Sequence, residues 1–249
     1  IATVTVSNPS KLNIVNSPIL EQLIASCNDL AQDSSLRAVV LTGGQAPSGK
    51  VPSFIGGADI KEMYQLPSSS EAKAFITRIH QACQALRDIP VPVIARIHGL
   101  CLGAGLEIAA ACDLRVATKD STFAMPEVKV GIPSVVEAAL LPSLIGMGRT
   151  RRLLYLAETL DARMAEQWGL VEKVVDNDVE LDRAVDEWTG QIVQMGPKAI
   201  RSQKTLMQRW ENSTIDEGIA AGVEAFGEAY EAGGKEPREH MGRFINRKK

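Results

Sequence analysis

Two glutamates beside small-residue turns are the residues of this sequence best suited to chemistry. Glu107 follows the turn Gly103-Ala104-Gly105, which joins an apolar segment to an apparent helix. Glu127 lies between a short apolar strand and the next glycine turn, in "FAMPEVKVGIP", residues 123–133. Two nearby carboxyl groups in a semi-apolar pocket can divide the roles of acid and base, because their repulsion keeps one of them protonated near neutral pH.

The turn at Gly103 can be interpreted in three ways. A dinucleotide fingerprint, G-x-G-x-x-G, needs a third glycine or alanine where Ile108 stands, and Glu107 would lie near the pyrophosphate. A tight turn that needs small residues for close packing is the second interpretation. In the third, small residues let a ligand oxygen approach the backbone N–H groups at a helix start, which stabilise developing negative charge.

A second glycine turn favours the third interpretation. The segment "SFIGGADIKEM", residues 53–63, also joins an apolar segment to a helix start through Gly56-Gly57-Ala58, with Asp59 as the expected N-cap. Two separate turns that each present N–H groups are what a two-donor oxyanion hole requires. Glu107 is then a catalytic group close to such a hole, and not a charge misplaced in a phosphate site.

The first half of the chain alternates strand and helix signals, which predicts an α/β fold with crossover helices. Amphipathic helices are expected over residues 17–33, with Ser17 as N-cap and Pro18 at the first helical position, and over residues 68–88. Strands are expected over residues 1–8, 36–44, 91–99 and 113–118.

Past residue 145 the pattern becomes helical. One helix is expected to begin near Pro197, and an apolar stripe follows Thr214. We expect this stripe to pack against its own or a neighbouring subunit. Its members are Ile215, Ile219, Val223, Phe226 and Tyr230.

The composition narrows the class of protein. The chain has 249 residues and a formal net charge of -3, and none of its apolar runs reaches the ~18 residues of a membrane span. This mildly acidic charge balance gives no electrostatic reason to expect nucleic-acid binding. Four scattered cysteines without a C-x-x-C pair predict a reduced, intracellular setting without disulfides or zinc. Because the sequence opens directly in a strand, we expect the natural N-terminus to lie upstream, so the choice between cytoplasm, mitochondrion and peroxisome stays open.

Five segments of the sequence resemble the enoyl-CoA hydratase/isomerase (crotonase) superfamily. They follow one another in the family's order across essentially the whole chain: "FIGGADIKEM", "HGLCLGAGLEIAAACDLRVAT", "FAMPEVKVGIP", "ARMAEQWGLVEKVV" and "EHMGRFINRKK". The resemblance implies an α/β fold, a ClpP-like spiral of repeated ββα units, over residues 1–195. It also implies a C-terminal helical trimerisation region over residues 196–249, and a homotrimer or a dimer of trimers.

The resemblance also implies roles by position. The backbone N–H groups of Ala58 and Ala104 would form the oxyanion hole; many members have glycine at the second position, but alanine serves because only the N–H is used. Glu107 would orient and deprotonate the attacking water, and Glu127 would deliver a proton to C2. Members that only isomerise commonly keep just the position of Glu127, so the presence of both acids favours hydration. No metal or redox cofactor is implied, and coenzyme A is part of the acyl-CoA substrate.

Contacts to the coenzyme A moiety are implied in the same way. The residues that would bind the substrate are Lys11, Leu12, Gly56, Ala58, Asp59, Ile60, Lys61, Gly103, Phe244 and Arg247. Phe244 and Arg247 fall where the family's C-terminal segment reaches the CoA of a neighbouring subunit. Arg247 stands where lysine is usual and keeps the positive charge that a phosphate needs. A solvated basic tail is the alternative for the last four residues.

The sequence departs from the family pattern in two places. Residues 131–146, "GIPSVVEAALLPSLIG", replace a glycine-rich segment that borders the acyl pocket in the family, which leaves the acyl preference open. Within it we expect Glu137 at a helix cap or on the surface, with a third site acid as the alternative. The loop 43–53 is longer than usual and either alters the CoA entrance or is a surface insertion. Four further residues are expected to be structural, because no nucleophile and base pair can be built from them: His80, His98, His240 and Cys101.

The sequence therefore predicts an enoyl-CoA hydratase that converts a 2-enoyl-CoA thioester into a 3-hydroxyacyl-CoA. A double-bond isomerase, a decarboxylase or a thioester hydrolase that uses the same oxyanion hole is the alternative among enzymes, because these reactions share the enolate. A non-catalytic CoA-binding scaffold or an RNA-binding relative is the alternative outside enzymes. The pair Glu107 and Glu127 argues against the scaffold, and the acidic composition argues against RNA.

Overall fold

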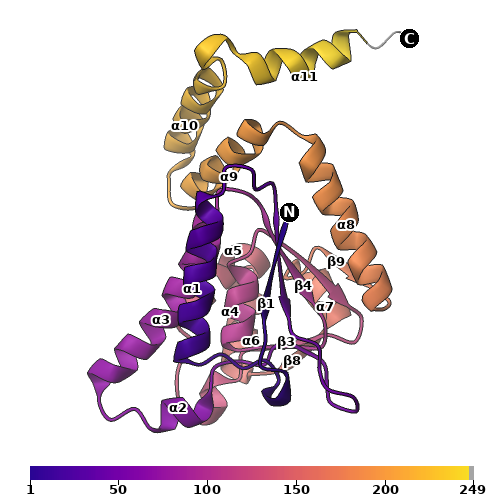
Figure 1. The fold of residues 1–249 in the computed structure, drawn as a ribbon. Coiled ribbons are helices and arrows are strands. Elements are labelled where there is room, and N and C mark those ends of the chain that lie inside the picture. The colour runs from indigo at the N-terminus through magenta and orange to yellow at the C-terminus, as the bar shows by residue number, and fades with distance from the viewer. Residues whose placement is uncertain (247–249) are drawn as a thin grey trace.

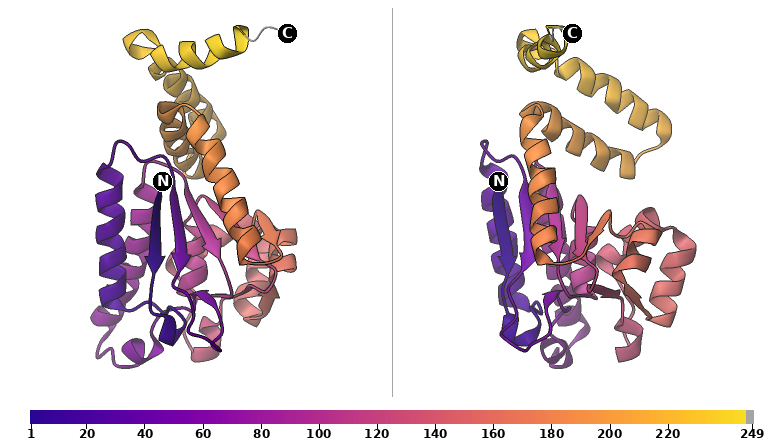
Figure 2. Two further views of the ribbon diagram at one scale, coloured as in Figure 1. Left: turned by 45° about the vertical axis from the view of Figure 1, so that its right-hand side comes forward. Right: turned by 90° about the vertical axis from the view of Figure 1, so that its right-hand side faces the viewer.

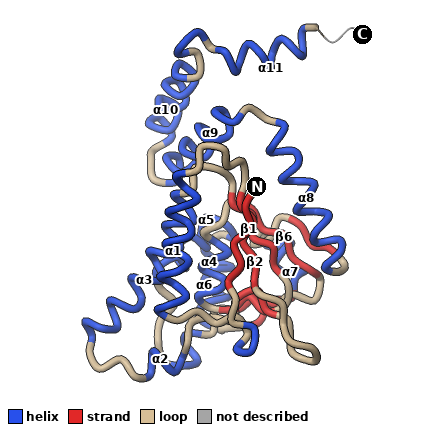
Figure 3. The backbone as a smooth tube through the Cα atoms, in the orientation of Figure 1, coloured by secondary structure: helices blue, strands red, loops and turns tan. Residues whose placement is uncertain are grey.

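The computed structural model describes residues 1–246 and contains two β-sheets surrounded by helices (Figure 1, Figure 3). The strands are β1 (Ala2–Val6), β2 (Val39–Gly43), β3 (Ser53–Ile55), β4 (Val93–Ile97), β5 (Leu100–Leu102), β6 (Leu114–Thr118), β7 (Thr122–Ala124), β8 (Thr159–Asp161) and β9 (Lys173–Val175). The larger sheet has the order β1-β2-β4-β6-β9 and is parallel throughout. The smaller sheet has the order β3-β5-β7-β8, in which β8 alone is antiparallel to its neighbour.

The chain passes repeatedly from the larger sheet to the smaller one. The next strand after β2 is β3, the next after β4 is β5, and the next after β6 is β7, so each step leads from the larger sheet to the smaller one. After β3 the chain returns through α2 (Ile60–Tyr64) and α3 (Ser69–Asp88), and after β5 it returns through α4 (Ala104–Ala110). The expected spiral of ββα units is therefore confirmed.

The central strands β2, β4 and β6 are largely buried on both faces, which explains their mainly apolar sequences, whereas the edge strand β1 alternates with exposed threonines. Successive residues of a strand point to opposite faces. Val39 and Leu41 join the main core beneath α1 (Ser17–Gln32) and α3, whereas Val40 packs with α8 (Asp178–Gln194). The sheet thus lies between α8 on one side and the α1–α3 pair on the other (Figure 2).

The helix predicted over residues 17–33 is present, but Asn16 is its N-cap, and the expectation for Ser17 was wrong. The Asn16 side chain accepts a hydrogen bond from the Ile19 N–H at 3.1 Å. The Ser17 hydroxyl instead contacts Glu62, which lies on α2. Asparagine and serine cap helices about equally well, so two adjacent candidates could not be separated by residue type. Asp59 caps α2 as expected and accepts a hydrogen bond from the Lys61 N–H at 2.9 Å.

The second half of the chain is largely helical, as predicted. Its remaining helices are α5 (Leu141–Ile145), α6 (Met147–Leu156), α7 (Ala162–Trp168), α9 (Pro197–Glu211), α10 (Ile215–Glu228) and α11 (Lys235–Ile245), with the short 3-10 helices η2 (Glu127–Val130), η3 (Val136–Leu140) and η4 (Glu231–Gly233); η1 (Pro9–Lys11) precedes them all. Among residues 1–246, none of the helices has the length and apolar character that a membrane span requires.

The C-terminal helices extend away from the sheets. Lys204 holds α9 against the core, because its buried Nζ lies 2.8 Å from Asp113 and donates to the Val91 carbonyl at 3.0 Å. The two helices that follow α9, namely α10 and α11, lie at the end of the molecule opposite α2 (Figure 1, Figure 2). Residues 1–246 leave four members of the apolar stripe uncovered, because Ile215, Ile219, Val223 and Phe226 are 62–83% exposed.

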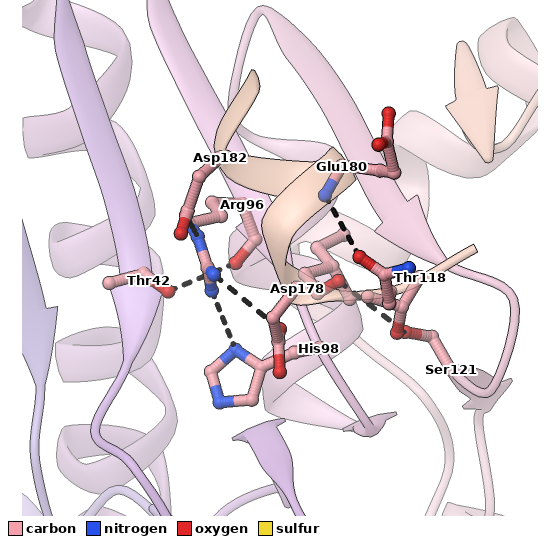
Figure 4. A network of polar contacts seen from close by, with 10 residues as sticks. Thr42, Arg96, His98, Thr118, Ser121, Asp178, Glu180 and Asp182 are labelled. Atoms are coloured by element: carbon pink, nitrogen blue, oxygen red, sulfur yellow. Dashed lines mark hydrogen bonds and ion pairs between the residues drawn. The ribbon is translucent and has the colours of Figure 1, made fainter. Parts of the chain in front are cut away.

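A polar network fixes the start of α8 against the larger sheet (Figure 4). The Arg96 guanidinium, on β4, lies 2.6 Å from Asp182 and 3.4 Å from Asp178. The same guanidinium lies 3.3 Å from Nδ1 of His98. Burial, and then the charge of Arg96, lower the pKa of His98. His98 is thus part of the structural framework, as expected from the sequence.

Close packing between α4 and β3 gives a direct test of the fold. A Cβ at Gly105 would clash with the Ile55 carbonyl, whereas a Cβ at Gly190, on α8, would meet open space. We expect Gly105→Ala to lower the free energy of unfolding by about 1–3 kcal/mol. Gly190→Ala, the matched control, should raise it by about 0.5–1 kcal/mol. Urea denaturation measures both, and equal effects would contradict the described packing.

Candidate active site

Three neighbouring strands of the smaller sheet end at one edge, where the predicted catalytic residues follow them. Because β3, β5 and β7 are parallel neighbours, their carboxyl ends lie side by side. The turn with Ala58 follows β3, the turn with Ala104 follows β5, and Glu127 follows β7. Glu107 lies one helical turn beyond Ala104, on α4. Sheet pairing therefore brings together residues from three separate motifs.

The backbone around Ala58 is held on both sides. The Gly57 carbonyl accepts a hydrogen bond from the Val15 N–H at 2.9 Å, and the Asp59 N–H donates to the Val15 carbonyl at 2.8 Å. Between these two bonds, the N–H of Ala58 forms no hydrogen bond with any part of residues 1–246. This N–H is thus a fixed donor without a partner inside the described chain.

The turn before Ala104 depends on a glycine. Gly103 has φ +51°, in the left-handed region that favours glycine, and its N–H donates to the Ala124 carbonyl at 2.9 Å. A Cβ at Gly103 would lie 2.5 Å from Oε1 of Glu127, so this carboxyl group lies directly over the turn. Ala104 is the first residue of α4. Like the N–H of Ala58, its N–H has no hydrogen-bond acceptor among residues 1–246.

Glu107 is a buried carboxyl group, only 4% exposed. Its Oε1 accepts a hydrogen bond from the Ala138 N–H at 3.3 Å. Burial, and then the negative charge of Glu127, raise the pKa of Glu107 to about 8, against the opposing effect of the Ala138 hydrogen bond. Glu107 therefore holds a proton at neutral pH and can donate it.

Glu127 is half-buried at the start of η2, and the Ser134 hydroxyl donates to its Oε2 at 2.8 Å. Ser134 and Ala138 thus hold the two glutamates from a single segment, residues 134–138. Sequence reasoning did not assign a role to either residue. The available signal was that this segment departs from the family's pattern next to the acyl pocket.

The expectation of a helix cap or a surface position for Glu137 was wrong. Glu137 is 6% exposed, and its Oε1 lies 2.7 Å from Nδ1 of His80 on α3. Its negative charge also raises the pKa of Glu107, although less than burial and Glu127 do. Glu137 is therefore a third carboxyl group close to the pair, which agrees with the alternative that the sequence left open.

Several residues predicted to contact coenzyme A lie together near the same edge. The Gly56 N–H donates to the Leu12 carbonyl at 2.9 Å, which joins the Lys11–Leu12 backbone to the turn of Ala58. The loop is anchored by buried Asn13, whose side chain donates to two backbone carbonyls at 2.7 Å. Exposed side chains of this group are Lys11, Leu12, Ile60 and Lys61, whereas Asp59 is buried as the cap of α2.

The C-terminal helix α11 does not lie at this edge within one chain (Figure 1). Phe244 belongs to α11, which lies at the end of the molecule opposite α2 (Figure 1). Arg247 lies outside the described residues. A contribution from Phe244 to this edge would therefore have to reach a neighbouring subunit, as the family resemblance implies.

The remaining nucleophile and metal candidates do not join this site. Cys101 is fully buried, and burial raises the pKa of its thiol well above the usual value. Within residues 1–246, no group of three or more His, Cys, Asp or Glu side chains is arranged to hold a metal ion.

The raised pKa of Glu107 predicts a specific dependence of stability on pH. Between its ordinary pKa, 4.5, and about 8, the folded protein keeps a proton on Glu107 that the unfolded chain releases. The free energy of unfolding should therefore fall as pH rises through this window, by at most about 1.4 kcal/mol per unit from this group. Glu107→Gln should remove this contribution, so its stability relative to the natural protein grows from pH 5 to pH 8. Urea titrations at several pH values measure this difference, and a constant difference would contradict the raised pKa.

Comparisons with known proteins identify the family of this chain. The family model described as enoyl-CoA hydratase/isomerase matches residues 1–249. The chain is 34% identical over 250 residues to the short-chain-enoyl-CoA hydratase of Clostridium acetobutylicum, with all of this chain and 92% of that protein covered. It is 31% identical to the crotonyl-CoA hydratase of Syntrophomonas wolfei, with 100% and 93% covered. The solved enoyl-CoA hydratase of Mycobacterium smegmatis is similar with a TM-score of 0.85 and 31% identity, over 92% of this chain and 88% of that one. The chain belongs to the enoyl-CoA hydratase/isomerase family.

Proposed function

We propose that this protein adds water across the double bond of a 2-enoyl-CoA thioester to give a 3-hydroxyacyl-CoA. The observation that carries the proposal is a pair of carboxyl groups, Glu107 and Glu127, beside two backbone N–H groups at neighbouring strand ends. Neither N–H group has a hydrogen-bond acceptor among residues 1–246. The names of the relatives from C. acetobutylicum and S. wolfei support short acyl chains, so crotonyl-CoA is the first substrate to test.

The two N–H groups act on the thioester oxygen. When water attacks C3, the π electrons of the double bond move toward C1, and negative charge develops on that oxygen as an enolate forms. The N–H groups of Ala58 and Ala104 stabilise this charge without reorganising, because sheet pairing and turn hydrogen bonds already fix their backbone. One such donor is typically worth about 10²–10³ in rate.

The two glutamates share one proton. In hydration Glu107 takes a proton from water as the oxygen bonds to C3, and Glu127 gives its proton to C2 of the enolate. In the free protein, burial and the charge of Glu127 leave the proton on Glu107. That distribution suits the reverse reaction, in which Glu107 protonates the departing hydroxyl and Glu127 removes the C2 proton. Hydration starts with the shared proton on Glu127 instead, because the forward and reverse reactions pass through the same steps in opposite order.

The substrate supplies the only additional group that this reaction needs, because coenzyme A is part of the thioester and the steps use proton transfer alone. We assign its adenosine and pantetheine portions to the loop of Lys11 and Leu12 and to Gly56–Lys61. The exposed Ile60 and Lys61 side chains and the hydrogen bond between Gly56 and Leu12 support this assignment. Phe244 and Arg247 would complete the site of a neighbouring subunit.

Exposed apolar side chains in the C-terminal helices support an oligomer. The exposed side chains of Ile215, Ile219, Val223 and Phe226 form an uncovered apolar stripe on α10. A groove of about 1050 Å³ lies beside it, lined by residues of α9, α10 and α11. We propose that other copies of this chain cover these surfaces in a trimer or a dimer of trimers.

Hydration of crotonyl-CoA tests the proposed function. Loss of the enoyl-thioester absorbance band should follow addition of the natural protein, and Glu107→Gln and Glu127→Gln should each lower kcat by about 10²–10⁴. The rate should fall as pH rises through about 8, because the proton shared by the pair is then lost.

Glu71→Gln, at an exposed position on α3, is the matched control and should keep the activity of the natural protein. An unchanged rate in either catalytic variant would remove that glutamate from the mechanism. Double-bond migration or thioester cleavage without hydration would favour one of the alternative reactions.

A proline substitution tests the oxyanion donor separately. Ala104 is the first residue of α4, a position where proline is tolerated although it lacks an N–H. We expect Ala104→Pro to fold and to lower kcat by about 10²–10³, because it removes one donor. Ser69→Pro, at the first residue of α3, is the control and should keep full activity. Full activity of folded Ala104→Pro would exclude its N–H as a donor.

A further inference from the structure

The proposed reaction leaves one buried charged group without a role. Glu137 is 6% exposed, and its Oε2 is buried without a hydrogen-bond partner in residues 1–246. Its Oε1 lies 2.7 Å from Nδ1 of His80, whose side chain is 50% exposed. A buried carboxylate destabilises a protein unless it is paired, and a pair buried on one side only contributes little to stability. Another reason is needed for Glu137 at this position.

The backbone next to Glu137 is strained. Val136 has φ +38°, in the left-handed region that β-branched residues avoid. Such conformations cost roughly 1–3 kcal/mol and persist when the surrounding structure holds them. The Ala138 N–H closes this turn by donating to the Val135 carbonyl at 2.9 Å, and it also reaches Oε1 of Glu107 at 3.3 Å. The strained turn thus ends on the group that contacts Glu107.

The position of His80 connects this turn to a rigid support. His80 lies on α3, a 20-residue helix that packs against both η3 and α4. The contact of His80 with Glu137 therefore fixes η3 relative to the helix that also borders Glu107. Because Glu137 and Ala138 are adjacent, a movement of the Glu137 side chain would shift the Ala138 N–H along the same backbone.

We propose that His80 and Glu137 clamp the strained turn at Val136, so that the Ala138 N–H holds the Glu107 carboxyl group in its reactive orientation. Both are positioning residues, since neither is assigned a contact with the substrate. The inference rests on the proposed function, because it explains how one of the two hydration carboxyl groups is held. It also gives the segment that departs from the family's pattern a specific task.

A double-mutant cycle tests the clamp. We expect His80→Ala and Glu137→Ala each to lower kcat for crotonyl-CoA by about 10- to 100-fold, because misplacing a catalytic group by about 1 Å has effects of this size. The KM should change by less than about twofold, since substrate binding is not altered. The double variant should be no slower than the slower single variant, because both substitutions break one contact. Lys73→Ala, at an exposed position on α3, is the control and should keep full activity.

The cycle also separates the clamp from a purely electrostatic role. Glu137→Ala removes a negative charge near Glu107, whereas His80→Ala keeps that charge. A charge effect would therefore lower the upper pKa of the pH–rate profile in Glu137→Ala alone. A clamp lowers kcat in both. A lowered upper pKa in Glu137→Ala with unchanged kcat, or natural activity in both variants, would overturn the proposal.

Hydrogen exchange provides a readout that does not depend on activity. The peptide over residues 132–141 should exchange about tenfold faster or more in both variants than in the natural protein, because the turn opens more often. Lys73→Ala should leave this exchange unchanged. If the natural protein failed to hydrate crotonyl-CoA, the proposed function would be contradicted, and the exchange rates alone would decide the clamp. Unchanged exchange in both variants would count against it.

Discussion

Parallel pairing of β3, β5 and β7 is the constraint on which the rest of the site depends. It places the ends of three short strands at one edge, and each strand is followed by a residue of the proposed chemistry. A shift of register by one residue would turn side chains to the opposite face and separate Gly103 from Glu127. The glycines at this edge follow from the same constraint, because α4 and Glu127 approach the backbone too closely for a Cβ.

The second constraint is electrostatic. Burying Glu107 beside Glu127 destabilises its ionised form, and the raised pKa of about 8 is the result. In the proposed mechanism, this destabilisation leaves one proton on the pair, as reversible addition of water requires. Residues 134–138 hold both carboxyl groups, through the Ser134 hydroxyl and the Ala138 N–H. The orientation of the two acids is therefore set by neighbours that take no part in the proposed bond changes.

The sequence was sufficient for much of the fold and for the outline of the site. Apolar periodicity located α1 and α3, and the two glycine turns pointed to helix starts with free N–H groups. Local patterns could not separate Asn16 from Ser17 as a cap, because both residue types serve. They also misplaced Glu137, because it is buried among elements distant in the sequence and contacts His80, which is 57 residues away. Contacts of this kind arise from helix packing and leave no local periodicity.

A crystal structure with butyryl-CoA, a saturated analogue that cannot be hydrated, tests the central claim most directly. The account predicts that the thioester oxygen accepts hydrogen bonds from the N–H groups of Ala58 and Ala104, at about 2.7–3.1 Å. It also predicts that C2 and C3 lie between the carboxyl groups of Glu107 and Glu127. A thioester bound away from the ends of β3 and β5, or an acyl chain that contacts neither glutamate, would contradict it.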